Sequence, residues 1–144
     1  MKTVKDILRI KGNEIWTTTP DATVYEALET MAEKNVGALV VLDADAIVGI
    51  MSERDYARKV ILHGRSSREI RVREIMTTEV YFVRPEQDIQ ECMAQMTDKR
   101  VRHLPALEND RLVGIISIGD VVKAVIAEHE STIKHLEDYI TGGR

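Results

Sequence analysis

Disulfide bonds and long apolar runs are both missing from this chain of 144 residues. Its single cysteine, Cys92, excludes an intramolecular disulfide and a cysteine-based zinc site, and it favours a reducing compartment. No apolar run approaches the roughly 20 residues that a membrane-spanning helix needs, and the first residues lack the apolar stretch of a secretory signal. We therefore expect no membrane partner, and the predicted location is cytoplasmic.

Aromatic residues and net charge are scarce as well. Aromatic residues make up 4% of the chain, and 20 basic against 24 acidic side chains give a net charge of −4. This balance argues against broad binding to a polyanion, so we predict no nucleic-acid partner. The 44% share of hydrophobic residues, with only 8 glycines and 3 prolines, is typical of a folded globular chain. A chain of this length buries a substantial core without needing disulfides.

What the sequence does contain is an internal repeat, which changes how every motif is interpreted. Sliding the chain by 65 positions lays residues 20–61 on residues 85–126 without a gap, and identical residues recur throughout. Upstream, residues 4–8 match residues 72–76 at an offset of 68. We interpret the chain as a first repeat with its leading segment (1–63), a linker (64–73), a second repeat (74–127) and a C-terminal helix extension (128–144).

Each repeat predicts the same series of elements. The β-branched and aromatic runs at 15–18 and 80–83 each end close to a proline, as short strands do. Apolar residues at helical spacing then predict one helix over 24–31 and another over 89–96. A hairpin and a second helix complete each β-α-β-β-α unit, with hairpin strands predicted over 38–42, 47–51, 104–107 and 112–116. We expect an α/β (α+β) fold of two such units about a pseudo-twofold axis, each with a three-stranded sheet.

A Gly-x-x-Ser-x-x-Asp motif follows the hairpin of each repeat, at 49–55 and at 114–120. A serine with a carboxylate three residues later is close to a capping box, which a helix needs simply in order to begin. The glycine also permits close backbone approach, and the free N–H groups of a helix N-terminus suit an anion. Residues 114–119 have the glycine spacing of a phosphate loop, but Asp120 stands where that loop has lysine. A carboxylate there repels phosphate and is better suited to ribose hydroxyls.

The motifs GIMSERD and GIISIGDVVK, together with VRHLP, resemble those of a pair of cystathionine-β-synthase (CBS) domains, also called a Bateman module. The resemblance covers nearly the whole chain and is strongest to small stand-alone bacterial CBS-pair signal-transduction proteins. It implies a non-enzymatic regulatory module that binds adenosine nucleotides (AMP, ADP, ATP or NAD(H)) in clefts between the repeats. It implies no catalytic residue, no catalytic cofactor and no metal, and the regulated protein is unknown.

The resemblance also implies which residues line the two clefts, each of which combines a ribose-binding aspartate from one repeat with backbone around the adenine from the other. The first cleft would be formed by Lys11, Gly12, Asn13, Val36, Gly37, Arg102, His103, Ser117 and Asp120. The second would be formed by Ser52, Arg54, Asp55, Thr77, Thr78 and Val101. Gly37 stands opposite Arg102 in the repeat alignment and Gly119 opposite Arg54, so we expect the clefts to differ in affinity or ligand.

Two alternatives stay open at the level of sequence. The two motifs could be mere helix caps in a constitutive protein-interaction or dimerisation scaffold without a physiological ligand. The arginine-rich linker could contact phosphates or an acidic partner, although a solvated linker is the simpler interpretation. In the C-terminal extension, five residues, all apolar except the histidine, recur at the 3 and 4 spacing of a coiled-coil seam: Ile126, His129, Ile133, Leu136 and Ile140. Such a helix could fold back on its own module or pair in a homodimer, and the resemblance favours the homodimer because two Bateman modules commonly pack together.

Overall fold

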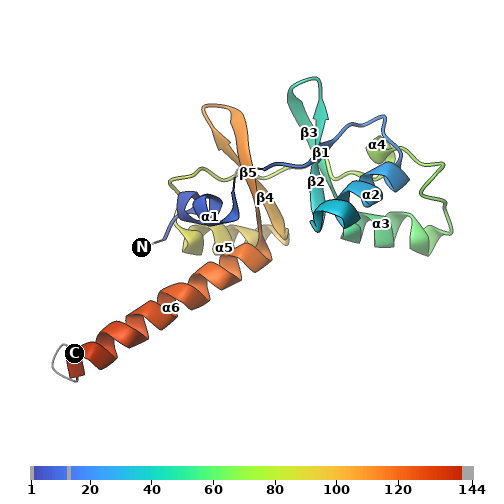
Figure 1. Ribbon diagram of the computed structural model, residues 1–144. Helices are drawn as coiled ribbons and strands as arrows, with labels where there is room; N and C mark the ends of the chain where they lie inside the picture. Colours follow the sequence, from blue (N-terminus) through green and yellow to red (C-terminus); the bar gives the residue numbers. More distant parts are fainter. Residues whose placement is uncertain (1, 13, 141–144) are drawn as a thin grey trace. The chain divides into compact units, whose positions relative to one another are not determined.

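The computed structural model describes residues 2–12 and 14–140, which divide into two compact units (Figure 1). The central unit is Ile15–Tyr81, and the terminal unit joins the residues up to Glu14 to those from Phe82 onward. The spatial units therefore differ from the sequence repeats, because the leading segment of each repeat belongs to the unit that contains the hairpin of the other repeat. Both units mix helices with strands, and the fold is α+β with two sheets.

The central unit contains a three-stranded sheet in the order β1-β2-β3. The first pair is parallel and the second antiparallel, as a β-α-β crossover followed by a hairpin requires. Its elements, in chain order, are β1 (Thr17–Thr18), α2 (Val24–Lys34), β2 (Ala38–Asp43), β3 (Ala46–Ser52), α3 (Glu53–Lys59), the 3-10 helix η1 (Ile61–His63) and α4 (Val72–Ile75). The three strands and two helices predicted for the first repeat are all present.

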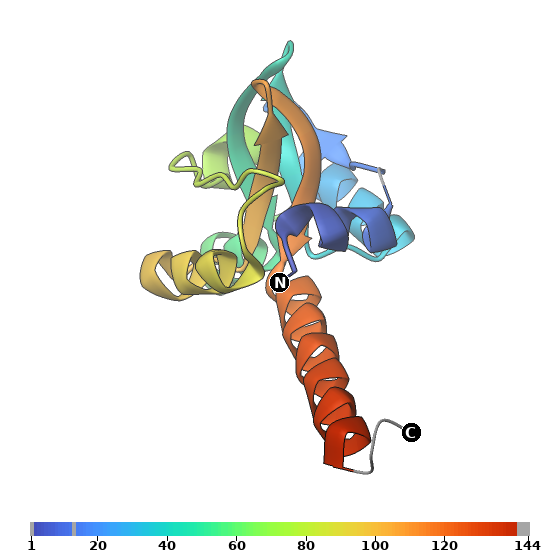
Figure 2. The same ribbon diagram turned by 90° about the vertical axis from the view of Figure 1, so that its left-hand side faces the viewer.

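The terminal unit contains the antiparallel hairpin of the second repeat and three helices that lie toward one end of it (Figure 2). Its elements, in chain order, are α1 (Val4–Lys11), α5 (Ile89–Lys99), β4 (His103–Glu108), β5 (Arg111–Ser117) and α6 (Ile118–Ile140). None of the helices in the described residues of either unit is long and apolar enough to cross a bilayer.

The strand expected over residues 80–83 does not form, which corrects the prediction for the second repeat. Only Val83 pairs with the sheet, through a parallel bridge to Ala106. Val83 N–H donates to Pro105 O at 3.0 Å, and Leu107 N–H donates to Val83 O at 2.9 Å. The next ladder bonds on either side would need N–H donors at Pro105 and Pro85, which prolines lack. Proline on both strands therefore limits the pairing to one residue.

The duplication is visible in the backbone as well as in the sequence. Asn35 and Arg100, which align in the two repeats, end α2 and α5 with the same left-handed conformation, φ 55° in both. The hairpin turns behave alike, with φ 54° at Ala44 and 53° at Asn109. Because a left-handed residue at a helix end redirects the chain toward the next strand, both repeats enter their hairpins in the same way.

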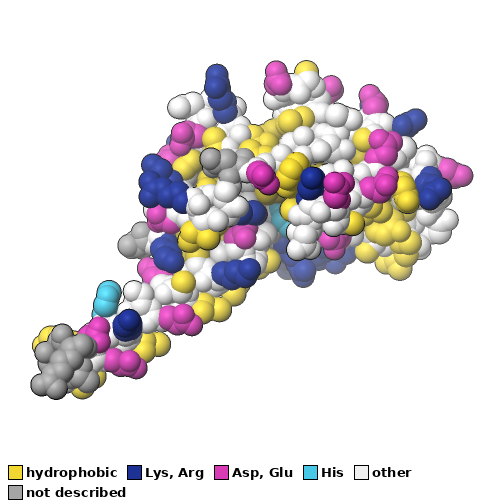
Figure 3. All heavy atoms as spheres, in the orientation of Figure 1, with side chains coloured by type: hydrophobic (Ala, Val, Ile, Leu, Met, Phe, Trp, Pro, Cys, Tyr) yellow, Lys and Arg dark blue, Asp and Glu magenta, His cyan; other side chains and the backbone are white. Residues whose placement is uncertain are grey.

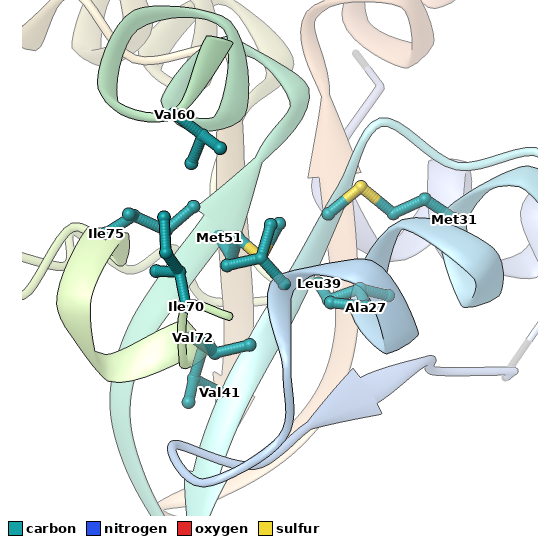
Figure 4. Packing of buried hydrophobic residues seen from close by; sticks show 10 residues of the cluster. Ala27, Met31, Leu39, Val41, Met51, Val60, Ile70, Val72 and Ile75 are labelled. Carbon is teal, nitrogen blue, oxygen red and sulfur yellow. The ribbon is translucent and has the colours of Figure 1, made fainter. Parts of the chain in front are cut away.

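The core of the central unit is built partly from residues beyond the first repeat (Figure 4). Ile70, Val72 and Ile75 pack with buried residues of α2, β2 and β3, such as Met31, Leu39 and Met51. The backbone of this segment is also bonded to the start of α2, since Val24 N–H donates to Ile70 O at 2.8 Å. These contacts explain why the leading segment of the second repeat belongs to the central unit.

The predicted linker is held against this unit by its arginines. Arg65 pairs with Glu74 at 2.9 Å, and the Arg68 guanidinium lies 4.4 Å from the centre of the Tyr25 ring. Arg71 donates to the carbonyl of Asp21, and Arg73 pairs with the carboxylate of the same residue. These side chains already have intramolecular partners, which weakens the interpretation of the linker as a site for external phosphates.

Candidate functional site

The serine and aspartate of each Gly-x-x-Ser-x-x-Asp motif form a reciprocal cap at the start of a helix. In the central unit, Ser52 N–H donates to Asp55 Oδ2 at 3.0 Å, and Asp55 N–H donates to Ser52 Oγ at 3.2 Å. In the terminal unit, the corresponding distances between Ser117 and Asp120 are 2.9 and 3.1 Å. The capping interpretation is confirmed, and it fixes one carboxylate in each unit in a defined orientation.

In each unit, the residue just before the first strand of the hairpin accepts a hydrogen bond from the first residue of the capped helix. Glu53 N–H donates to Gly37 O at 3.1 Å, and Ile118 N–H donates to Arg102 O at 2.8 Å. Gly37 thus lies beside the Ser52 turn and Arg102 beside the Ser117 turn. Each unit therefore brings the end of its hairpin, the preceding loop and the first helical turn together at one place.

The motif glycines admit the leading segment of the other repeat. A Cβ on Gly49 would lie 2.9 Å from the carbonyl oxygen of Thr77 and from the sulfur of Met76, because the two backbones pair closely there. Ile50 and Thr77 exchange two backbone hydrogen bonds, of 2.9 and 2.8 Å. A Cβ on Gly114 would collide with the side chain of Leu8 on α1. Leu8 and Met76 occupy matching positions of the two leading segments.

Asp55 is surrounded by donors from its own unit. Thr77 Oγ1 donates to Asp55 Oδ1 at 3.1 Å, and Lys59 Nζ lies 3.2 Å from the same oxygen. Lys59 also donates to the carbonyl of Ile75 at 2.8 Å. Sequence reasoning missed Lys59, although it follows Asp55 by four residues, the spacing at which helical side chains of opposite charge meet.

Asp120 has a different partner, which comes from α1. Lys11 Nζ donates to Asp120 Oδ2 at 2.8 Å and to the carbonyl of Ile115 at 2.8 Å. Burial alone would raise the pKa of Asp120, but hydrogen bonds from Lys11 and Ser117 outweigh it and hold the pKa below its usual value. Asp120 is thus ionised at neutral pH and linked to the end of α1.

His103 completes this group in the terminal unit. It is the register partner of Ser117 in the hairpin. Burial lowers its pKa below the usual value, the positive charges of Lys11 and Arg102 lower it further, and Asp120 opposes the shift. A histidine of lowered pKa is neutral at pH 7 and is a candidate hydrogen-bonding group rather than a fixed cation.

The comparison with protein families agrees with this arrangement, since a CBS domain model matches residues 4–62 and 72–127. This chain belongs to the CBS domain family. The mitochondrial CBS domain-containing protein CBSX3 of Arabidopsis thaliana is 44% identical to it, over 98% of this chain and 73% of the relative. Among solved structures, a signal-transduction protein with CBS domains from Burkholderia ambifaria MC40-6 is 54% identical with a TM-score of 0.84, and the match covers 88% of this chain and 95% of that one.

A more distant structure shares the fold. The CBS domain pair of protein MJ0100, solved in complex with 5′-methylthioadenosine and S-adenosyl-L-methionine, has a TM-score of 0.78 at 22% identity. The match covers 89% of this chain and 98% of that one. The two segments matched by the CBS domain model, 4–62 and 72–127, identify the tandem repeat as a CBS pair.

The remaining predicted site residues of this CBS pair are distributed between its units. Gly12, with φ 95°, ends α1 beside Lys11, whereas Val36 packs against the core of the central unit. Arg54 and Thr78 are exposed in the central unit, and Val101 precedes β4 in the terminal unit. Asn13 lies outside the described residues. The terminal unit thus brings together Lys11, His103, Ser117 and Asp120. The central unit brings together Ser52, Asp55 and Thr77.

Metal ligands are not clustered in the described part of this CBS pair, and its cysteine is buried. No cluster of three or more His, Cys, Asp or Glu side chains is found there that could hold a metal ion. Cys92 is fully buried on α5, and burial raises its pKa to about 11, which makes the thiol unreactive.

Proposed function

We propose that this CBS pair is a non-enzymatic regulatory module that binds an adenosine nucleotide (AMP, ADP, ATP or NAD(H)) with Asp120 and Asp55 as acceptors for ribose hydroxyls. The carrying observation is the pair of carboxylates, each held at the same kind of turn by the Ser and backbone of a repeated motif. The complex of the MJ0100 pair with two adenosine compounds supports this ligand class. A carboxylate held in place accepts hydrogen bonds from hydroxyl groups without reorganisation, which favours binding.

The two carboxylates differ in the acceptor capacity left for a ligand. A carboxylate has about four lone-pair positions. Asp55 uses Oδ2 for the N–H and hydroxyl of Ser52, and Oδ1 for Thr77 and Lys59. Asp120 accepts from Ser117 N–H and Lys11 at Oδ2, while no described residue donates a hydrogen bond to its Oδ1. We therefore assign the stronger ribose site to Asp120.

Basic and donor groups near Asp120 suit the phosphates of the same ligand. Lys11 Nζ lies at the carboxylate, and the positive charges of Lys11 and Arg102 lower the pKa of His103. In the central unit the aligned positions hold Ala38 and Gly37, which offer no side-chain donor. This difference reinforces the assignment of a nucleotide to the terminal unit and predicts weaker phosphate binding near Asp55.

The test is calorimetric titration of the protein with AMP, ATP, NAD and NADH. We expect at least one nucleotide to bind wild type and Asp120→Asn to weaken that binding about tenfold or more, as loss of a charge-assisted acceptor should. Asp98→Asn is the control with the same change of charge on an exposed side chain. Failure of all four nucleotides to bind, or equal binding by wild type and Asp120→Asn, would contradict the proposal.

A constitutive scaffold is the second candidate, and the complete set of intramolecular partners at Asp55 favours it. Under that function Ser52, Asp55, Ser117 and Asp120 serve only as helix caps. Nucleotide would then leave the melting temperature unchanged, whereas under the first function saturating ligand raises the unfolding free energy by about 2.7 kcal/mol at 100 times Kd. The two functions are therefore separated by a thermal-shift series.

We propose that the module self-associates as a homodimer through α6 and signals nucleotide occupancy to a further protein partner. Ligand changes such an assembly only through its different affinities for two states. A cytoplasmic location stays a prediction, checked by fractionation.

A further inference from the structure

The distal half of α6 carries apolar side chains that no element of its own unit covers. α6 packs against α5, β5 and α1 near its beginning, and its buried residue is Val121. Beyond those contacts the helix extends away from α1 and α5 (Figures 1 and 2). Ile133, Leu136 and Ile140 are 55%, 58% and 81% exposed. Exposed apolar side chains gathered on one helix mark a surface for a partner.

These side chains form a narrow seam rather than a broad face. The seam consists of Val122, Ile126, His129, Ile133, Leu136 and Ile140. Its alternating spacing of 4 and 3 is that of the a and d positions of a coiled coil, with Ile126, Ile133 and Ile140 at a. Figure 3 shows hydrophobic side chains along one edge of the projecting helix, interspersed with acidic ones.

The charges beside the seam are unlike those of a helix that lies on a membrane. Membrane-surface helices carry mainly lysine and arginine on the polar face. α6 has an excess of acidic residues, with only Lys123 and Lys134 against Asp120, Glu128, Glu130, Glu137 and Asp138. A protein helix with a matching seam is the better complement for this pattern.

The seam is complementary to itself when the second helix runs in the opposite direction. In an antiparallel pair, a positions face d positions: Ile140 faces Val122, Leu136 faces Ile126 and Ile133 faces His129. This register places Lys123 beside Glu137 of the second copy, and twofold symmetry forms the ion pair twice. On the other flank, Val125 lies beside Tyr139 of the second copy, which widens the apolar contact at both ends.

A parallel pair lacks these ion pairs. In that orientation an e position faces a g position of the other helix, so Glu130 would face Val125 and Glu137 would face Thr132. No opposite charges meet on either flank. The antiparallel register has one unfavourable contact, since Glu130 lies near Glu130 of the second copy at the symmetry axis.

We propose that α6 pairs with α6 of a second copy of this chain in antiparallel orientation, with Lys123 beside Glu137 of the other copy. The proposal rests on the self-association named above, and it does not depend on nucleotide binding. Lys123 and Glu137 are 14 positions apart in one helix, about 21 Å, so they have no direct contact within one chain. Any coupling between them must therefore arise between copies.

The experiment is sedimentation analysis over a concentration series for wild type, Lys123→Glu, Glu137→Lys and the double variant. Each single change replaces two attractive contacts by two repulsive ones, and we expect the dimer dissociation constant to rise about fivefold or more. The double variant restores both pairs and should return to within about twofold of wild type. Lys134→Glu, at an outward b position, is the matched control and should leave dimerisation unchanged.

A second readout uses cysteine cross-linking, because the native Cys92 is buried. A mixture of Lys123→Cys and Glu137→Cys proteins should yield a disulfide-linked heterodimer in preference to either homodimer. Circular dichroism confirms that each variant keeps its helix content.

Three outcomes overturn the proposal. If wild type is monomeric throughout the series, the chain does not self-associate. The same conclusion holds if the monomer instead binds anionic vesicles through Ile133 and sediments with them. If Ile133→Asp leaves the dimer intact, the interface lies elsewhere than on α6. A double variant as weak as the single ones shows that α6 does not pair in this register, while nucleotide binding measured separately stays unaffected.

Discussion

Lys11 Nζ lies 2.8 Å from Asp120 Oδ2, although the two residues are 109 positions apart in the chain. The same ammonium group donates to the carbonyl of Ile115, so one side chain connects the end of α1 with the last strand and with the first turn of α6. The leading segment of the first repeat is thereby tied to the carboxylate proposed to bind ribose. A ligand that changes the contacts of Asp120 therefore also changes the contact that holds the end of α1.

Replacement of Lys11 by Met should destabilise the terminal unit modestly. The side chains of Lys11 and Asp120 are 30% and 22% exposed, so solvent screens their attraction in part. We expect Lys11→Met to lower the unfolding free energy by about 1 kcal/mol in urea denaturation followed by circular dichroism. A double-mutant cycle with Asp120→Asn should give a coupling of about 0.5 to 1 kcal/mol.

Lys5→Met on the exposed face of α1 is the control for the loss of a positive charge. Equal effects of Lys5→Met and Lys11→Met, or additive effects in the cycle, would show that the ion pair contributes nothing.

The two motif glycines should differ in their tolerance of alanine. The Cβ of Gly49→Ala meets a backbone carbonyl, that of Thr77, which cannot move without breaking its pairing with Ile50. The Cβ of Gly114→Ala meets the tip of Leu8, a flexible side chain. We expect Gly49→Ala to cost about 1–3 kcal/mol and Gly114→Ala to cost less.

Trp16, the only tryptophan, lies in the central unit and reports on Gly49→Ala by fluorescence, whereas circular dichroism covers both units. Combining Leu8→Ala with Gly114→Ala should relieve the collision. A Gly114→Ala protein that is less stable than Gly49→Ala would contradict the packing argument.

Removing the donors to Asp55 Oδ1 should strengthen its site. The double variant Thr77→Val, Lys59→Met frees two lone-pair positions on a carboxylate whose acceptors are all in use. If nucleotide binds as proposed, calorimetry should show a second binding event, or one tightened several-fold. Thr19→Val, an exposed threonine of the same unit that lies outside both predicted clefts, serves as control. Unchanged stoichiometry and affinity would show that acceptor capacity does not limit this site.

The pKa of His103 should respond to its charged neighbours in opposite directions. Burial and Lys11 lower this pKa and Asp120 raises it, so Lys11→Met should raise it and Asp120→Asn should lower it further in NMR titration. Because folding lowers the pKa, the folded state binds fewer protons than the unfolded state as pH falls below about 6.5. The stability contributed by neutral His103 is therefore present above that pH and is lost as pH falls.

His103→Gln should flatten the dependence of stability on pH in this range, whereas His135→Gln, on the exposed part of α6, should leave it unchanged. An unaltered slope in His103→Gln would contradict the assignment.

Much of the local structure could be predicted because its causes are local. The apolar spacing of α2 and α5 and the Ser-x-x-Asp caps of α3 and α6 depend on residues within one or two turns, and all are present. The strand predicted over 80–83 does not form, because a hydrogen-bonded ladder needs N–H donors from both strands and Pro105, on the distant strand β4, has none. Propensity in one segment carries no information about the partner that it will meet.

By itself the sequence determined that this protein is a duplication in which each repeat has a helix, a hairpin and one capped carboxylate. These features follow from the internal repeat, from periodicity and from short spacing, while the resemblance to the CBS family is carried by the motifs. Only the tertiary structure decided that the leading segments exchange units, so that Lys11 reaches Asp120 and Thr77 reaches Asp55. Nearly identical motifs therefore present different acceptor capacity, because lone pairs are used by residues that the fold, and not the motif, brings near.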